Sequence, residues 1–292
     1  MPKSVLLPVA LALLLGGLLT TRASAQFDQY TAPGASPAEP EDRKGQVEKA
    51  MDEARWRLGR LRVDPTFGLR DVQYLDNSSG TADGGESDFT ASASAGLRAY
   101  IRTGPKVFWA AHVIPEYVWW QDATDRRRLD GRYGAGMFAF WNRLTVEATA
   151  TREENQGYLS PEVAQLTHSR SDRFGLTAEV KVSGRVYAFL GAEQFEIRSL
   201  DEREPTAAPF ERFDRDLSLL RGGVGYRLPR GFSVGVGVEQ SDIEFIDPAS
   251  PSLDRSNRGT SPLVQIRQAN EDRFFRLEVV RRALEPKRGS SF

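Results

Sequence analysis

Apolar and polar residues alternate with a period of two along much of the chain, most clearly over residues 88–120. From Phe89 to Ile101 every second residue is apolar, and serine, threonine, glycine, tyrosine and arginine fill the positions between. Thr103-Gly104-Pro105 interrupts the pattern, and a second alternating run continues to Trp120. This predicts two antiparallel strands joined by a tight turn, each with one apolar and one polar face. Both strands are longer than the roughly 9 to 11 residues needed to cross a bilayer.

The same alternation predicts eleven strands after Gly59. They cover residues 61–74, 89–102, 106–120, 129–141, 144–153, 173–182, 185–197, 215–228, 232–240, 262–269 and 273–282. Five tight turns alternate with five longer loops, among them 154–172 and 242–259. Outer-membrane barrels place short turns at the periplasmic end and long loops outside. We therefore expect an all-β fold, an antiparallel up-and-down transmembrane β-barrel of about 11 to 12 long strands. A soluble β-sandwich is the alternative.

Charged residues occupy the polar positions of these strands, where they are candidates to face the lumen of the barrel. The candidates are Arg98, Arg102, Arg132, Arg143, Glu147, Glu179, Lys181, Glu193, Arg221, Arg227, Glu239, Arg267, Arg276 and Glu278. Such residues either brace the interior of a narrow barrel or select a solute, and the sequence leaves both interpretations open.

The N-terminal part of the chain precedes the strands and differs from them in composition. Residues 1–25 have the features of a cleaved signal peptide: Lys3, an apolar run over 5–19, and small residues at 23–25. Residues 26–40 are rich in proline, alanine, serine and glycine, and we expect a disordered linker there. No other stretch approaches 18 apolar residues, so we expect no membrane-spanning helix in the mature chain.

A single amphipathic helix is predicted over residues 41–58, between the linker and the barrel of residues 59–292. Val47, Met51, Ala54 and Leu58 recur at helical spacing and form one apolar stripe. We expect a periplasmic helix packed against the mouth of the barrel, or alternatively a lumen plug or a partner-docking helix. The periodicity reports only that one face is apolar and does not decide between them.

Composition excludes several classes of function. The chain has 292 residues, 27% of them charged, with a net charge of -1, which predicts neither disorder nor a nucleic-acid-binding surface. Without cysteine there are no disulfides and no thiolate metal sites. The two histidines, His112 and His168, are not part of a recognisable nucleophile–base arrangement, so we expect no catalytic residue, metal site or cofactor.

The number of predicted strands poses a problem for closure. A closed bacterial barrel needs an even number of antiparallel strands, whereas the sequence predicts eleven. The tail 283–292 contains Pro286 and is too short after it for a spanning strand. We therefore expect a C-terminally incomplete barrel, a partner strand, or a twelfth strand hidden in 286–292 or upstream of Leu61.

Short motifs resemble the beta-barrel porin family of bacterial outer membranes. In that family a short helix precedes a first strand ending in an aromatic-x-Asp-Asn pattern. The matching residues here are Arg57-Leu58-Gly59-Arg60-Leu61-Arg62-Val63-Asp64-Pro65, followed by Val72, Tyr74, Asp76 and Asn77. The turn Asn142-Arg143-Leu144-Thr145 is also similar, and the resemblance extends over about residues 58–282.

The resemblance implies an outer-membrane, porin-like channel or conduit without enzymatic activity. It implies outer-membrane lipid and lipopolysaccharide and the barrel-assembly machinery as partners. Some members are encoded beside exopolysaccharide export machinery, so polysaccharide-export proteins are further expected partners. The alternatives are a non-conducting structural or assembly component of a surface-polysaccharide export system, and a soluble periplasmic β-sandwich binding module.

Overall fold

The computed structural model describes residues 43–75, 87–160, 163–200, 214–229, 232–246, 256–270, 273–280 and 284–286. Side chains are described over the same ranges except 156–160, 163–167 and 267–286. The predicted signal peptide and linker lie outside the described residues.

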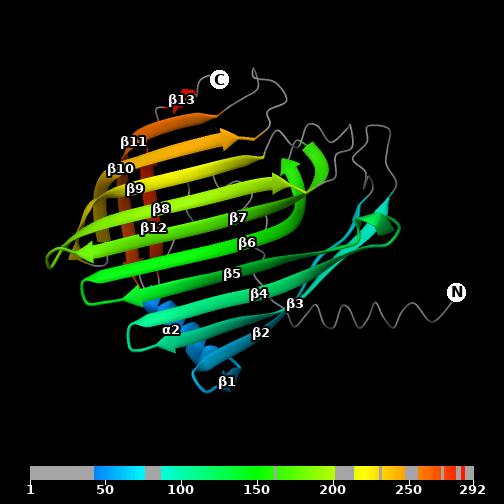
Figure 1. The fold of residues 1–292 in the computed structure, drawn as a ribbon, viewed down its shortest axis with the longest axis horizontal. Helices are drawn as coiled ribbons and strands as arrows, with labels where there is room; N and C mark the ends of the chain where they lie inside the picture. Colours follow the sequence, from blue (N-terminus) through cyan, green and yellow to red (C-terminus); the bar gives the residue numbers. More distant parts are fainter. Residues whose placement is uncertain are drawn as a thin grey trace. The chain divides into compact units, whose positions relative to one another are not determined.

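The strands form one antiparallel sheet in which each strand pairs with its neighbours in chain order (Figure 1). The long strands are β2 (Leu61–Leu75), β3 (Asp88–Thr103), β4 (Val107–Trp120), β5 (Arg128–Phe140), β6 (Leu144–Ser160), β7 (Val163–Lys181), β8 (Val186–Ser199), β9 (Arg215–Arg227), β10 (Phe232–Phe245), β11 (Asn257–Asn270) and β12 (Arg273–Val280). Two short strands, β1 (Trp56–Leu58) and β13 (Leu284–Pro286), pair with β2 and β11. Among the described strands, β1 and β12 are the edges and do not pair with each other.

The predicted all-β antiparallel architecture is confirmed, and strands β2 to β12 each overlap one of the eleven predicted strands. The period of two was informative because apolar side chains follow one face of the sheet along almost every strand.

The loops predicted over 154–172 and 242–259 are wrong for much of their length. Strands β6 and β7 continue to Ser160 and from Val163, and β10 and β11 continue to Phe245 and from Asn257. The strands stay paired in register through these polar segments, although the segments have no apolar face. Oppositely charged residues pair across the strands there, which stabilises extended structure that apolar alternation does not reveal.

The predicted helix 41–58 ends earlier than expected. Helix α2 spans Arg43–Glu53, and Trp56–Leu58 forms β1 instead of a last helical turn. Leu58 pairs with Leu61, so Gly59 and Arg60 form a two-residue hairpin turn. Gly59 has a φ of 62°, a conformation that glycine adopts without steric cost.

The last strand reaches further than predicted. Val280 pairs with Leu263 and Leu284 pairs with Gly259, a step of four residues on both strands. Strand β13 therefore continues β12 in the same register along β11, and β structure extends to Pro286 rather than ending at 282. Together the two pieces cover a length comparable to that of the neighbouring strands.

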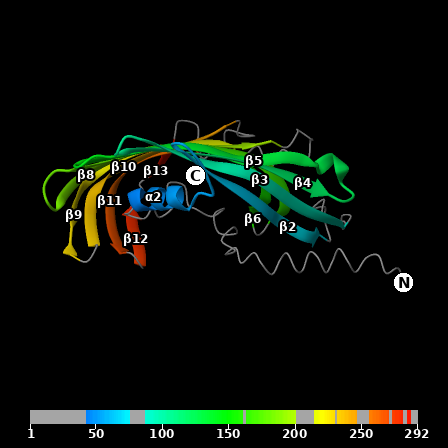
Figure 2. The same ribbon diagram turned by 90° about the horizontal axis from the view of Figure 1, so that it is seen from below.

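Helix α2 lies against one face of the sheet (Figure 2). Its Val47 is buried against Phe108 of β4 and Phe138 of β5, and Met51 is packed against this cluster. Within the described parts of the chain, the helix is too short and too polar to cross a membrane, and so is every other helical segment.

Candidate functional site: the two faces of the sheet

One face of the sheet exposes large apolar side chains on strand after strand. Val113 of β4 is 54% exposed, and its partners across the neighbouring strands are Leu97 and Tyr133. The exposed apolar residues on this face include Phe67, Leu69, Leu97, Ile101, Trp109, Val113, Tyr117, Leu129, Phe174, Leu176, Val180, Leu190, Leu220, Val224, Tyr226, Val236, Val238 and Val264. We call this surface the apolar face. An exposed apolar surface that continues over so many strands is typical of contact with a membrane or a partner, since isolated exposed residues would be scattered over both faces.

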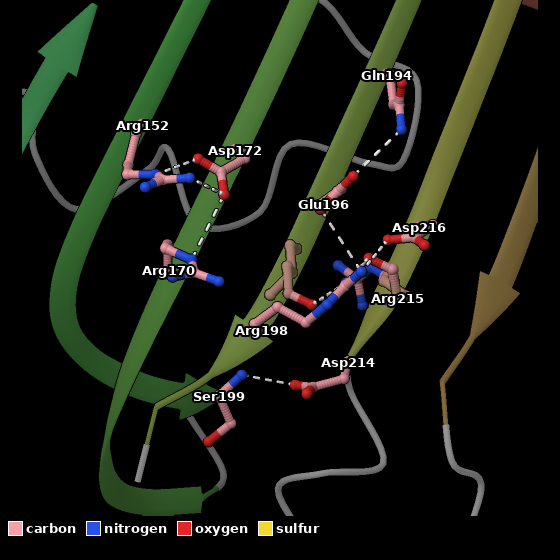
Figure 3. A network of polar contacts seen from close by, with 11 residues as sticks. Arg152, Arg170, Asp172, Gln194, Glu196, Arg198, Ser199, Asp214, Arg215 and Asp216 are labelled. Carbon is pink, nitrogen blue, oxygen red and sulfur yellow. Dashed lines mark hydrogen bonds and ion pairs between the residues drawn. The ribbon is translucent and has the colours of Figure 1, made fainter.

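Ion pairs border the apolar face near the loop ends of β6 to β9 (Figure 3). The Nε atom of Arg152 lies 2.6 Å from Oδ1 of Asp172, its registered partner. Arg198 Nη2 lies 2.6 Å from Oδ1 of Asp216. On β7, Phe174 and Asp172 are successive residues of this face, and the change from an apolar to a charged side chain occurs between them. The apolar face therefore ends at a row of charged residues.

The opposite face, which we call the polar face, carries charged and hydroxyl side chains. Arg70 of β2 donates from Nε to Glu116 of β4 at 3.1 Å, and a second donation comes from its Nη2. Glu116 is only 6% exposed. Between them on β3 lie the buried Ser92 and Ser94, whose small side chains leave room for the pair to meet.

A second charged group surrounds Asp130 of β5, which is 2% exposed. Arg128 Nε lies 3.0 Å and 3.1 Å from the two carboxylate oxygens. His168 Nε2, from β7, lies 3.0 Å from Oδ1. Because a buried carboxylate is stable only with such partners, this group ties β5 to the extended β6–β7 hairpin.

A third group joins β7, β8 and β9. Arg173 Nε lies 3.1 Å from Oε1 of Glu193, and Arg227 donates to Glu179 from two strands away. The Arg227 guanidinium lies 5.4 Å from the ring centre of Tyr187, on the strand between. This geometry adds a cation–π contact to the ion pair.

Glycines on the polar face allow bulky neighbours to lie flat against the sheet. A Cβ atom on Gly225 would lie 2.2 Å from Cζ of Tyr187, and one on Gly235 would lie 2.6 Å from Nε2 of Gln265. Tyr187 and Gln265 are almost fully buried as a result. Side chains thus cover the backbone of this face closely.

Helix α2 covers the turn-side end of the polar face of β4 and β5. Besides the Val47 contacts, Arg43 Nε lies 3.5 Å from Oε2 of Glu147 on β6. Arg102 Nη1 of β3 lies 3.9 Å from Oε1 of Glu48. The helix is therefore held by apolar packing and by charges on both sides.

The register places most of the predicted lumen-facing residues on the polar face. These are Arg98, Arg102, Arg132, Glu147, Glu179, Lys181, Glu193, Arg221, Arg227 and Glu239. Arg267, Arg276 and Glu278 occupy positions of the same parity, although their side chains are not described. Arg143 differs: it lies exposed in the turn between β5 and β6, so it does not belong to a strand face.

The sequence did not single out Arg70, Glu116, Arg128 and Asp130. Arg70 is followed by a register shift before Gln73, which breaks the alternation in β2. Glu116 has the same parity as His112, so its face was predictable, but its pairing with a residue two strands away was not.

Among the described residues, no group of three or more histidine, aspartate or glutamate side chains is placed to hold a metal ion. No family model matches the chain, and neither the curated proteins nor the solved structures contain a match to it.

Proposed function

We propose that this chain is an outer-membrane β-barrel protein, a porin-like channel or conduit whose apolar face contacts lipid and whose polar face lines the interior. The observation that carries the proposal is the segregation of exposed apolar residues to one face of a long-stranded sheet. In a bilayer this face is solvated by lipid, while the backbone is satisfied by the strand ladder.

The dimensions of β4 support this proposal. Trp109 and Trp119 lie on the apolar face near the two ends of the strand, ten residues apart. At about 3.4 Å per residue and a tilt of about 40°, they are separated by roughly 26 Å along the membrane normal. This matches the apolar band of about 25 Å between the aromatic girdles of outer-membrane barrels. Phe89 packs edge-on against Trp119, with ring centres 6.2 Å apart.

The direction of β1 supports closure of the sheet. Strand β1 is antiparallel to β2, and β12 runs in the same direction as β2 because neighbours alternate along the sheet. Edges β1 and β12 are therefore antiparallel to each other, and with β1 the number of strands is even. Trp56 and Leu58 are exposed with the parity of the apolar face, as a closing strand requires.

The proposal is tested by locating the mature chain in a Gram-negative-type host. We expect it in the outer-membrane fraction, resistant to extraction by alkaline carbonate, because its apolar face is in lipid. Release with soluble periplasmic proteins on osmotic shock would contradict the proposal and favour a soluble sandwich.

A second function, a non-conducting structural or assembly component of a surface-polysaccharide export system, is favoured by the close covering of the polar face. Helix α2 and the ion pairs occupy surface that an open channel leaves to water. Planar-bilayer recording of the purified chain distinguishes the two functions. Steps of conductance support the channel, and their absence at all salt concentrations supports the closed component. Lipopolysaccharide, the assembly machinery and export proteins remain proposed partners in both cases.

A further inference from the structure

Arg98 and Arg132 differ from the arginines of the polar face that form ion pairs. Arg70, Arg128, Arg173 and Arg227 each have a carboxylate within ion-pair distance. Within the described ranges, neither Arg98 nor Arg132 has such a partner. The Nε atom of Arg132 is buried and makes no hydrogen bond there. A buried guanidinium N–H without an acceptor is costly, so this pair of side chains is suited to a ligand that supplies oxygen atoms.

The register brings the two arginines to either side of His112. Arg98 of β3 is the direct partner of His112 of β4, and Arg132 of β5 lies opposite Ile114, two residues along β4. All three share the polar face. Strands β3 and β5 are about 10 Å apart, a distance that two long arginine side chains can bridge through one oxyanion.

Two of the neighbouring positions on the polar face are glycines. Gly96 lies between Thr66 and Ile114 in the next row, and Gly134 is the partner of His112. A Cβ atom on Gly134 would lie 2.4 Å from Cε1 of His112, so glycine lets the imidazole lie flat on the sheet. The buried Oγ1 of Thr66 also has no hydrogen-bond partner among the described residues. Two buried polar atoms without a hydrogen bond among the described residues, Thr66 Oγ1 and Arg132 Nε, thus lie in the same row of the polar face.

The acids near the pair do not neutralise it. Asp64 lies opposite Arg98, but its Oδ1 is 3.6 Å from Nε of Arg55. Glu153 lies opposite Arg132 without an ion pair in the described structure. With His112 neutral, these groups leave one positive charge in excess, which favours an anion.

We propose that Arg98 and Arg132 bind an oxyanion group of a solute, a carboxylate, phosphate or sulfate, with His112 as a hydrogen-bonding neighbour. The inference rests on the proposed function, because it requires the polar face to be the interior. It extends that function by assigning a class of solute: the conduit handles acidic molecules. Helix α2 packs against Phe108 and Phe138, two rows further toward the turns than His112, so a solute entering from the loop side meets the arginines before the helix.

The test uses the full mature chain folded in detergent micelles and equilibrium dialysis against inorganic sulfate at constant ionic strength. We expect saturable binding at one site. The double variant Arg98→Gln, Arg132→Gln should bind at least tenfold more weakly, because both guanidinium groups are lost. Arg152→Gln, on the opposite face, is the matched control and should bind as the wild type does. Glu153→Gln should bind several-fold more tightly, a gain that misfolding cannot produce.

Competition identifies the chemical source of the oxyanion. Displacement of sulfate by gluconate identifies a carboxylate solute, and displacement by glucose 6-phosphate identifies a phosphate solute. Displacement by neither identifies a sulfate group as the ligand. Linear uptake by the wild type, or equal binding by the double variant, would overturn the inference. Binding is measured in micelles and the proposed function by membrane location, so a chain that inserts without binding refutes the inference alone. A chain that binds without inserting refutes the function and the role of the site in a conduit, but not the oxyanion site itself.

Discussion

The ion pairs of the apolar face and those of the polar face differ in how many strands they cross. On the apolar face, Arg198 and Asp216 join β8 to its neighbour β9, and Asp242 and Arg258 join β10 to its neighbour β11. Each of these pairs stays within one hairpin or one rung of the ladder.

On the polar face, two ion pairs cross a whole strand, whereas Arg173 and Glu193 join the adjacent strands β7 and β8. Arg70 and Glu116 join β2 to β4, and Glu179 and Arg227 join β7 to β9. Backbones two strands apart are separated by about 10 Å, so side chains meet over that distance only where they converge. We infer that the sheet is locally concave on the polar face at both places, as the inside of a barrel is.

The two kinds of ion pair should differ most in how much the free energy of unfolding falls when the acidic residue is removed. Glu116→Ala should lower the free energy of unfolding by about 2 to 4 kcal/mol, because it leaves Arg70 without its partner beside a nearly buried position. Asp242→Ala, in the exposed row, should cost less than about 1 kcal/mol. Urea titration followed by tryptophan fluorescence measures both. Equal effects would contradict the distinction between the faces.

Two glycines of β9, one on each face, test the difference between the faces through side-chain packing. Gly225→Ala should cost about 1 to 3 kcal/mol, because its Cβ would overlap the buried Tyr187 ring. Gly222→Ala, on the apolar face of the same strand, meets atoms only at 3.5 Å and beyond, so its cost should stay within about 0.5 kcal/mol. Unfolding curves of the two variants provide the measurement, and a larger effect at Gly222 would reverse the assignment of faces.

A smaller effect is expected where α2 meets the polar face. Val47→Ala should cost about 1 to 2 kcal/mol, because Val47 is buried against Phe108 and Phe138. Lys49→Ala, exposed on the same helix, should be neutral within about 0.5 kcal/mol. Thermal or urea unfolding of both variants decides whether the helix is part of the folded sheet; no difference between them would mean that it is not.

The positions of the strands could be predicted from the sequence because the period of two is a local property. Phe89 to Ile101 shows it within a single strand, and the tight turns mark the ends of the strands. The extension of β6 and β7 could not be predicted in this way. Arg152 pairs with Asp172 across the hairpin, and a pairing between positions twenty residues apart leaves no apolar signal.

The candidate site was predictable only in part, for a similar reason. The alternation of polar and apolar residues assigned Arg98 and Arg132 to the polar face. It could not predict that they lack acidic partners, because this depends on the ion pair between Asp64 and Arg55. Strand β1 was mistaken for the end of a helix because Trp56–Leu58 is too short to show a period of two. Its pairing with β2 depends on the turn at Gly59.

The central claim, that the apolar face lies in lipid, is tested most directly by a lysine placed at adjacent positions of β7. Leu176 lies on the apolar face and Thr177 on the polar face, and the chain is folded into lipid vesicles and unfolded with urea. We predict that Leu176→Lys lowers the free energy of unfolding by about 2 to 4 kcal/mol. Thr177→Lys, whose neighbours on the polar face include Glu147, should change it by less than about 1 kcal/mol. An unchanged stability of Leu176→Lys, as expected for an exposed leucine in water, would contradict the account.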